Sequence, residues 1–356
     1  MKKKYEDNVE ENQVPELAIH DALLYAENFE DKMQRTSPIP VLPQLSVALG
    51  ILIFVFSVTY IGASKTVTKG PNAENYRVEA AATMNIEKKE PREYIFNNTK
   101  LIAESAFIWD VQEQKILFNK NGDKKLPLAS ITKLMTALVA YELLDPEDNI
   151  RISNESLKTD GDSGFSDGEE FSMQDLTDLT LISSSNDGAV ALGREAARSI
   201  SDKNSEEVFV TAMNIKAKEL GLTNTSFENA TGLDLSSTAA GAYGSARDVA
   251  LLMEYIITHQ ADAIALTTID TTAISNESGE FHIAKNTNEV VNDIDGLIAS
   301  KTGYTELAGG NLVVAFNAGL NRPIVVVVLG SSQNGRFSDT LELVRKAREF
   351  VSKESE

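Results

Sequence analysis

The sequence predicts an α+β domain, in which helices cluster against an antiparallel sheet, preceded by one transmembrane helix. Three observations support the fold of the domain: two strand-like segments at 105–122, helical periodicity that dominates 173–260, and a second strand pair at 311–331 followed by a helix. Strands gathered at both ends of a helical middle are typical of helices that pack on an antiparallel sheet. A run of apolar residues at 45–63 predicts the transmembrane helix.

The composition excludes several classes of function. The chain has 356 residues, with 33 Lys and Arg against 53 Asp and Glu, for a formal net charge of −20. So acidic a chain is a poor nucleic-acid binder, because contacts to phosphates need clustered Lys and Arg. The absence of Cys excludes disulfides, iron–sulfur clusters and thiolate zinc sites, and the three His are scattered. We therefore expect no metal, no other cofactor and no nucleic-acid partner.

Residues 45–63 form a stretch of 19 residues without a charge. A helix of that length rises roughly 28 Å, which is enough to cross the hydrocarbon core of a bilayer. The alternatives are a buried core helix and a cleaved signal peptide, but 44 residues precede the run, whereas a signal peptide has a short positive start. Basic residues flank the run on both sides, so the positive-inside rule does not decide its orientation.

The apolar run divides the chain into parts. Residues 1–44 are polar and mostly acidic after the opening lysines, and we interpret them as a tail. Residues 64–93 carry mixed charge and two prolines, Pro71 and Pro91, and we interpret them as a linker. The folded domain is predicted to span 94–356.

Local patterns predict the elements of the domain in order. Residues 105–122 alternate apolar and polar residues around a polar turn, which predicts two strands. Apolar residues recur at helical spacing over 131–144, which predicts a helix. Residues 311–331 predict two more strands joined by a turn, and 337–352 predict the final helix.

Ser130 and Lys133 form an S-x-x-K motif at the predicted start of the 131–144 helix. Residues three apart lie on one face of a helix, about one turn apart. A serine hydroxyl is a weak nucleophile unless a base takes its proton, and a buried lysine can be that base when burial and neighbouring positive charge lower its pKa. The helix amino terminus adds a backbone N–H and a positive dipole end for a developing oxyanion. Alone the motif is weak, because an N-capping Ser and a solvated Lys give the same pattern.

Ser184, Ser185 and Asn186 form an S-x-N triplet between an apolar run and another predicted helix. A hydroxyl and an amide at this point can relay a proton and bind a substrate amide. Alone this motif is weaker still, because an ordinary turn between two helices explains it equally well.

Lys301, Thr302 and Gly303 form a K-T-G triplet shortly before the predicted strands at 311–331. A Lys beside a Thr hydroxyl suits recognition of a carboxylate, and the Gly allows a substrate backbone to approach a strand edge. The alternative is a charged residue in a hairpin.

The three motifs gain their meaning from their order and spacing. Their first residues are 54 and 117 residues apart, in the order of the penicillin-recognising serine acyltransferases and β-lactamases. Over roughly 100–350 the chain resembles the D-alanyl-D-alanine carboxypeptidases, which are low-molecular-mass penicillin-binding proteins. The similar segments include LPLASITKLMTALVA, GEEFSMQDLTDLTLISSSNDGAVALG, FENATGLD, SARDVALLMEYI and IDGLIASKTGYTELAGGNLVVAF. The resemblance implies a β-lactamase/transpeptidase-like fold for the domain.

The resemblance also implies a serine D,D-carboxypeptidase that removes the terminal D-alanine from peptidoglycan stem pentapeptides. Ser130 would attack the carbonyl of the penultimate D-alanine, and Lys133 would remove its proton. Ser184, with the Lys301 ammonium nearby, would pass a proton to the leaving D-alanine, and Asn186 would hold the acyl chain. β-Lactam antibiotics would form the same ester and leave slowly, as covalent inhibitors.

The substrate-binding groups follow from the same resemblance. Lys301 and Thr302 would recognise the terminal carboxylate, and Arg336 would assist them on a weaker match to the family. The backbone N–H groups of Ser130 and Tyr304 would form the oxyanion hole. Because the substrate lies in the cell wall, the resemblance implies a single-pass protein of the cell membrane, with a cytoplasmic tail and an extracytoplasmic catalytic domain.

The chain departs from the family pattern at two places. Family members usually pass directly from Asp-Gly and a hydrophobic residue into K-T-G, whereas Ile298, Ala299 and Ser300 intervene here. We expect this insert to reshape the lip of the cleft. Ser185 stands where Gly is common. Neither departure removes a catalytic group.

Three alternative functions stay open. An endopeptidase that cuts D-alanine cross-links shares all three motifs. A β-lactamase needs a deacylating Glu in an E-x-x-L-N context, and Glu228 lies in FENATGLD, which lacks that pattern. A non-catalytic wall-binding module is disfavoured by the intact Ser130, Lys133 and Lys301.

Two further features near the S-x-N motif have ordinary interpretations. The sequence GDSG at 161–164 resembles the surroundings of a chymotrypsin-like nucleophile, but that chemistry requires a His upstream in the domain, so we predict a loop. Seven acidic residues fall between Asp160 and Asp178 with no basic residue among them. We interpret them as a solvated acidic face, and the alternative is a preference for stem peptides with a cationic side chain.

Overall fold

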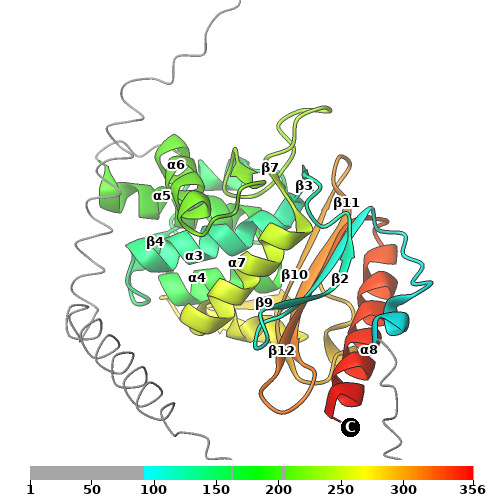
Figure 1. Ribbon diagram of the computed structural model, residues 1–356. Helices are drawn as coiled ribbons and strands as arrows, with labels where there is room; N and C mark the ends of the chain where they lie inside the picture. Colours follow the sequence, from blue (N-terminus) through cyan, green and yellow to red (C-terminus); the bar gives the residue numbers. More distant parts are fainter. Residues whose placement is uncertain (1–91, 162, 202–205, 356) are drawn as a thin grey trace, which may run out of the picture. The chain divides into compact units, whose positions relative to one another are not determined.

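The structure, a computed structural model, describes residues 92–161, 163–201 and 206–355 (Figure 1). The predicted tail, the predicted transmembrane helix and nearly all of the predicted linker lie outside these residues. Within the described ranges, no helix combines the length and the apolar character that crossing a membrane requires. The mixture of helices and antiparallel strands confirms the predicted α+β class.

An antiparallel sheet of five strands, in the order β10-β11-β12-β1-β2, forms the centre of the domain. Its strands are β1 (Ser105–Asp110), β2 (Lys115–Lys120), β10 (Leu297–Thr305), β11 (Gly309–Asn317) and β12 (Pro323–Ser331). The two predicted strand pairs are β1–β2 and β11–β12, and both are confirmed. They join because β1 pairs with β12, with Ile108 opposite Val326. The two ends of the domain therefore share one sheet.

Apolar elements cover both faces of this sheet. Residues 325–328 of β12 are fully buried, a pattern that requires apolar cover on each side. On one face lie α8 (Gly335–Ser355) and the 3₁₀ helix η1 (Arg92–Phe96), and on the other lies the helical cluster (Figure 1). The sheet is thus the partition between the terminal helix and the helical part of the domain.

Five helices make up the cluster: α3 (Lys133–Leu143), α4 (Met173–Ile182), α5 (Asn186–Ile200), α6 (Glu206–Glu219) and α7 (Ala246–His259). Helices α4, α5 and α7 each begin after a Ser whose side chain accepts a hydrogen bond from the N–H three residues later, at Ser172, Ser185 and Ser245. Helix α3 is the most buried of the five and contacts the other four. Its first residue, Lys133, is also fully buried.

Helices dominate 173–260 as predicted, but the expectation of a helical middle without strands is wrong between α6 and α7. There β6 (Ser226–Phe227) and β7 (Ala242–Gly244) form a small sheet with β3 (Leu126–Pro127), in the order β3-β7-β6. Residues 220–245 are rich in Gly, Asn, Ser and Thr, which favour turns over helix. This small sheet fixes the chain just upstream of Ser130.

Several short elements had no counterpart in the prediction. Two hairpins consist of β4 (Asn149–Arg151) with β5 (Glu170–Ser172), and β8 (Thr271–Ser275) with β9 (Phe281–Lys285). The short 3₁₀ helices are η2 (Ala129–Thr132), η3 (Ser156–Lys158), η4 (Ala261–Ala263), η5 (Ala265–Thr268) and η6 (Val291–Asp293). In β8 and β9 only Ile274 and Ala284 are buried, so the apolar alternation that identifies a strand is weak.

The segment that departs from the family pattern continues β10 away from the K-T-G triplet. A register shift between Leu297 and Ala299 accommodates Ile298 as a bulge. Ala299 and Ser300 are buried, and Ser300 hydrogen-bonds Thr267 of η5 through both its N–H and its hydroxyl. The extra residues therefore anchor the strand to η5.

Candidate active site

Ser130 and Lys133 meet where η2 leads into α3. The Lys133 side chain is fully buried, and its Nζ lies 2.9 Å from Ser130 Oγ. Lys133 Nζ also donates to Asn186 Oδ1 at 2.7 Å and to the backbone oxygen of Thr231 at 2.9 Å. A neutral amine has two N–H donors, so these two oxygens leave its lone pair for the Ser130 hydroxyl proton.

The electrostatic surroundings of Lys133 favour this neutral form. Complete burial, and then the nearby charge of Lys301, hold the pKa of Lys133 well below its ordinary value of 10.5. A lysine that is neutral near pH 7 can accept a proton, as a general base must. The site therefore contains a serine hydroxyl in contact with a lysine amine that is suited to accept its proton.

Ser184 and Asn186 come from the turn between α4 and α5. Ser184 has a φ of 62°, in the left-handed region that non-glycine residues seldom occupy. Its hydroxyl accepts a hydrogen bond from Lys301 Nζ at 2.9 Å. Asn186 contacts Lys133 through Oδ1 and donates through Nδ2 to the backbone oxygen of Asp160 at 2.6 Å. The S-x-N triplet thus contacts both buried lysines.

Ser185, which stands where Gly is common in the family, stabilises the local structure. Its hydroxyl accepts the Gly188 N–H at 3.0 Å and so caps α5. The same oxygen lies 2.6 Å from Ser163 Oγ, in the GDSG sequence. The described residues of that sequence, Gly161, Ser163 and Gly164, therefore belong to a loop that is attached to the S-x-N turn, in agreement with the prediction of a loop.

The K-T-G triplet lies on β10, the edge strand of the large sheet. Lys301 is almost fully buried, and burial, followed by the charge of Arg336, lowers its pKa to about 7. Thr302 Oγ1 lies 2.6 Å from Thr287 Oγ1. Tyr304, two residues further along, is partly exposed.

Gly303 is required by the protein itself. A Cβ on Gly303 would lie 2.8 Å from the Leu128 oxygen and 3.1 Å from the Ser130 nitrogen. The sequence explained this Gly by the approach of a substrate. The structure shows that residues 128–130, which we call the nucleophile turn, already occupy that side of the strand. Any side chain at this position would displace Ser130.

Arg336, at the start of α8, reaches the same strand from the opposite side of the sheet. Its Nη1 donates to the Gly303 oxygen at 2.9 Å. Its buried Nε has no hydrogen-bond partner among the residues that the structure describes. Arg336 therefore places a positive charge near Lys301 and retains an unused donor.

The loop from Asn229 to Asp234 completes the site, although the sequence assigned no role to these residues. Thr231 supplies the oxygen that accepts from Lys133, and Asn229 Oδ1 holds the loop by accepting from the Gly232 N–H at 2.7 Å. Asp234 accepts from the Thr305 hydroxyl at 3.0 Å, which ties the loop to the end of β10. An Asn-x-x-Gly spacing such as that of 229–232 is typical of a turn, but no local pattern shows that this turn packs beside Lys133.

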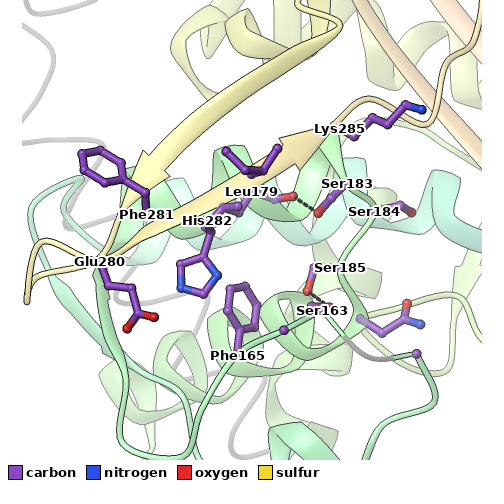
Figure 2. Close-up of a pocket in the computed structure, with 14 residues that line it drawn as sticks. Ser163, Phe165, Leu179, Ser183, Ser184, Ser185, Glu280, Phe281, His282 and Lys285 are labelled. Carbon is purple, nitrogen blue, oxygen red and sulfur yellow. Dashed lines mark hydrogen bonds between the residues drawn. The ribbon is translucent and has the colours of Figure 1, made fainter.

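A pocket of about 600 Å³ opens beside Ser184 and Asn186. Its walls are the loop around Ser163 and Phe165, the turn at 183–186, and β9 with Glu280 (Figure 2). Figure 2 shows the His282 ring beside Phe165, and the two ring centres are 5.3 Å apart. His282 also pairs with Glu169, which gives it a structural role in one wall.

The acidic residues between 160 and 178 do not form one solvated face. Glu169 pairs with His282 and also accepts from Asn276. Asp178 is buried in α4, where burial raises its pKa to about 6 and Gln174 donates to it at 3.0 Å. Within the described residues, no group of three or more His, Cys, Asp and Glu side chains is arranged to hold a metal ion.

Comparison with known proteins places these motifs in a family context. The family described as D-alanyl-D-alanine carboxypeptidase, peptidase S11, matches residues 92–333. The chain is 35% identical over 248 residues to D-alanyl-D-alanine carboxypeptidase DacF of Bacillus subtilis, which covers 68% of this chain and 61% of that relative. It is 32% identical over 254 residues to a D-alanyl-D-alanine endopeptidase of Pseudomonas aeruginosa, covering 69% and 77%. The chain thus spans about three fifths of the length of DacF.

A solved structure supports the fold. Penicillin-binding protein D2 of Listeria monocytogenes, in its cefotaxime-bound form, is 27% identical with a TM-score of 0.59, and the likeness covers 70% of this chain and 98% of that one. This likeness confirms the expected transpeptidase-like α+β fold.

Proposed function

Since the chain belongs to the D-alanyl-D-alanine carboxypeptidase family, we propose that it is a serine D,D-carboxypeptidase that removes the terminal D-alanine from peptidoglycan stem pentapeptides. One observation carries the proposal: the buried Lys133 amine, whose pKa lies well below its ordinary value, is 2.9 Å from Ser130 Oγ. That contact supplies the activated hydroxyl that acyl transfer requires.

In the proposed reaction, Ser130 Oγ attacks the carbonyl carbon of the penultimate D-alanine while Lys133 takes the hydroxyl proton. The backbone N–H groups of Ser130 and Tyr304 stabilise the oxyanion, a contribution commonly worth about 3–4 kcal/mol. The C–N bond then breaks, and the leaving D-alanine amine receives a proton through Ser184, which Lys301 contacts. Water hydrolyses the ester, and Ser130 regains its proton.

The substrate carboxylate would lie at the cationic end of the site. Lys301 and the Thr302 hydroxyl are the groups available for it, and the Arg336 guanidinium adds positive charge at this end of the site. A bound carboxylate would also stabilise the charged form of Lys301, which the proton transfer needs. On the other side, Asn186 and the adjoining pocket would hold the acyl chain.

A serine substitution in the full-length chain tests the nucleophile. Ser130→Ala should abolish D-alanine release from a pentapeptide and covalent labelling by a fluorescent penicillin. Ser199→Ala, which removes an exposed hydroxyl on α5, is the matched control and should leave both unchanged. Labelling of Ser130→Ala at the unmodified rate contradicts the assignment.

An endopeptidase that cuts D-alanine cross-links is the second candidate function. The relative from Pseudomonas aeruginosa that is named an endopeptidase favours this candidate. Incubation with a pentapeptide and with a purified cross-linked muropeptide dimer distinguishes the two activities. Release of free D-alanine alone supports the carboxypeptidase, and conversion of the dimer to monomers supports the endopeptidase.

The proposed location is the cell membrane, with 45–63 as a single anchor, 1–44 as a cytoplasmic tail, 64–93 as a linker and 94–356 as the extracytoplasmic domain. The charge-free run and the extracytoplasmic position of peptidoglycan support this arrangement. Because the chain has no Cys, single substitutions give a clean test. An impermeant maleimide should label Ser352→Cys in intact cells, but Asn12→Cys only after lysis, and the reverse pattern contradicts the topology.

A further inference from the structure

Asn311 is a buried polar residue of β11 that no part of the proposed chemistry uses. It is fully buried and lies directly opposite Gly303 of the K-T-G triplet in the β10–β11 pair. A buried amide in a sheet is costly unless its donors and acceptor are all satisfied. Its partners therefore indicate why an amide occupies the position.

The amide of Asn311 connects three segments of backbone. Its Nδ2 donates to the oxygens of Pro127 and Leu128, both at 3.0 Å. Its Oδ1 accepts from the Gly330 N–H of β12 at 2.8 Å. The side chain thus attaches the segment just before Ser130 to β11 and β12 of the large sheet.

That segment needs to be held. Ala129 has a φ of 47°, a strained conformation for a residue with a side chain, and it directly precedes Ser130. A strained turn persists only where its surroundings determine it. Gly303 packs against the Leu128 oxygen, and Asn311 binds that same oxygen.

We propose that Asn311 is a positioning residue for the nucleophile: by binding the Pro127 and Leu128 carbonyl oxygens, it fixes the turn that keeps Ser130 Oγ on the Lys133 amine. The inference rests on the proposed role of Ser130. Besides the substrate binding proposed for the K-T-G triplet on β10, the neighbouring strand β11 would hold the nucleophile turn in place.

The substitution Asn311→Asp tests the role with little change in shape. It replaces the donating amide nitrogen by an oxygen, which then faces two carbonyl oxygens that it repels. Asn214→Asp on α6 is the matched control. Asn214 Nδ2 also donates to two backbone oxygens, those of Val210 at 3.0 Å and Phe227 at 2.8 Å, and its Oδ1 accepts the Phe227 N–H at 2.9 Å.

The measurement is acylation of the full-length chain by a fluorescent penicillin, well below the melting temperature of every variant. The final stoichiometry reports the folded fraction, and the rate constant reports the geometry of the folded molecule. We expect Asn311→Asp to lower the rate constant by roughly 30-fold or more, because a misplacement of about 1 Å can cost about 100-fold. Asn214→Asp should lower the melting temperature and leave the rate constant unchanged.

Each outcome decides one point. Equal rate constants for Asn311→Asp and Asn214→Asp, with loss confined to the stoichiometry, overturn the positioning role. If Asn311→Asp does not fold, Asn311→Ala compared with Asn214→Ala gives the same test without an added charge. If the unmodified chain is not acylated at all, the proposed function fails, and that result is distinct from failure of the inference about Asn311.

Discussion

Replacing Gly232 by Ala should separate the nucleophile from its base. A Cβ at this position would lie 1.9 Å from the Ala129 oxygen and 2.5 Å from both the Ala129 carbonyl carbon and Thr132 Oγ1. Ordinary contact begins near 3.4 Å, so the loop or the nucleophile turn has to move by about 1.5 Å. Movement of the turn would displace Ser130, because Ala129 directly precedes it. Movement of the loop would displace the Thr231 oxygen, which accepts a hydrogen bond from Lys133.

The magnitude has two parts. The φ of Gly232 is 80°, and an L-residue in that region costs about 1–2 kcal/mol. Overpacking against backbone atoms adds about 1–3 kcal/mol, so the free energy of unfolding should fall by about 2–5 kcal/mol. A displacement of more than about 1 Å between reacting groups should lower the acylation rate of the folded molecules about 100-fold.

The assay combines urea unfolding with penicillin acylation of the full-length chain. Gly221→Ala is the matched control, because Gly221 has a φ of 70° but no atom within 4 Å of the added Cβ. It should lose only the backbone part, about 1–2 kcal/mol, and acylate at the unmodified rate. An acylation rate for Gly232→Ala equal to that of Gly221→Ala would refute the reasoning.

Two further predictions concern pH. Removing the charge of Arg336 by Arg336→Gln should raise the pKa of Lys301 from about 7. Because the proposed mechanism needs Lys301 protonated, the alkaline limb of kcat/KM for D-alanine release should move to higher pH, and a limb that stays in place contradicts the coupling. Burial raises the pKa of Asp178 to about 6, so its ionisation destabilises the fold increasingly as pH rises from about 4 to 6. At pH 7.5, urea unfolding should therefore give Asp178→Asn a free energy of unfolding higher than that of the unmodified chain, by up to about 3 kcal/mol. This difference should disappear near pH 4. A difference that does not change with pH argues against this reasoning.

Much of the fold followed from local sequence patterns. Four strands were predicted because apolar residues alternate or cluster within a few positions, as they do in β1, β2, β11 and β12. Helix α8 was predicted because its apolar residues recur at helical spacing. Strand β10 was not predicted as a strand, because its pattern is interrupted by Lys301 and Gly303. The hairpin of β8 and β9 was missed because each strand buries a single residue, and sheet pairing there is decided by what packs on it.

The same division applies to the site. The S-x-x-K motif lies within one turn of chain, so its sequence spacing already predicted the contact between Ser130 and Lys133. The lowered pKa of Lys133 depends first on its burial by the surrounding elements and then on the charge of Lys301, which lies on another strand. The contact between Lys301 and Ser184 spans 117 residues, and no local pattern specifies it.

By itself, the sequence determined which residue types are available for acyl transfer, the order of the three motifs and the class of the fold. Only the tertiary structure decided that Thr231 and Asn186 share the Lys133 amine, that Gly303 yields space to the nucleophile turn, and that Asn311 holds this turn to the sheet. The physical reason is the distance along the chain over which each kind of interaction acts. Periodicity, capping and motif spacing act over a few residues, whereas burial, pKa and the filling of space depend on segments that only packing brings together.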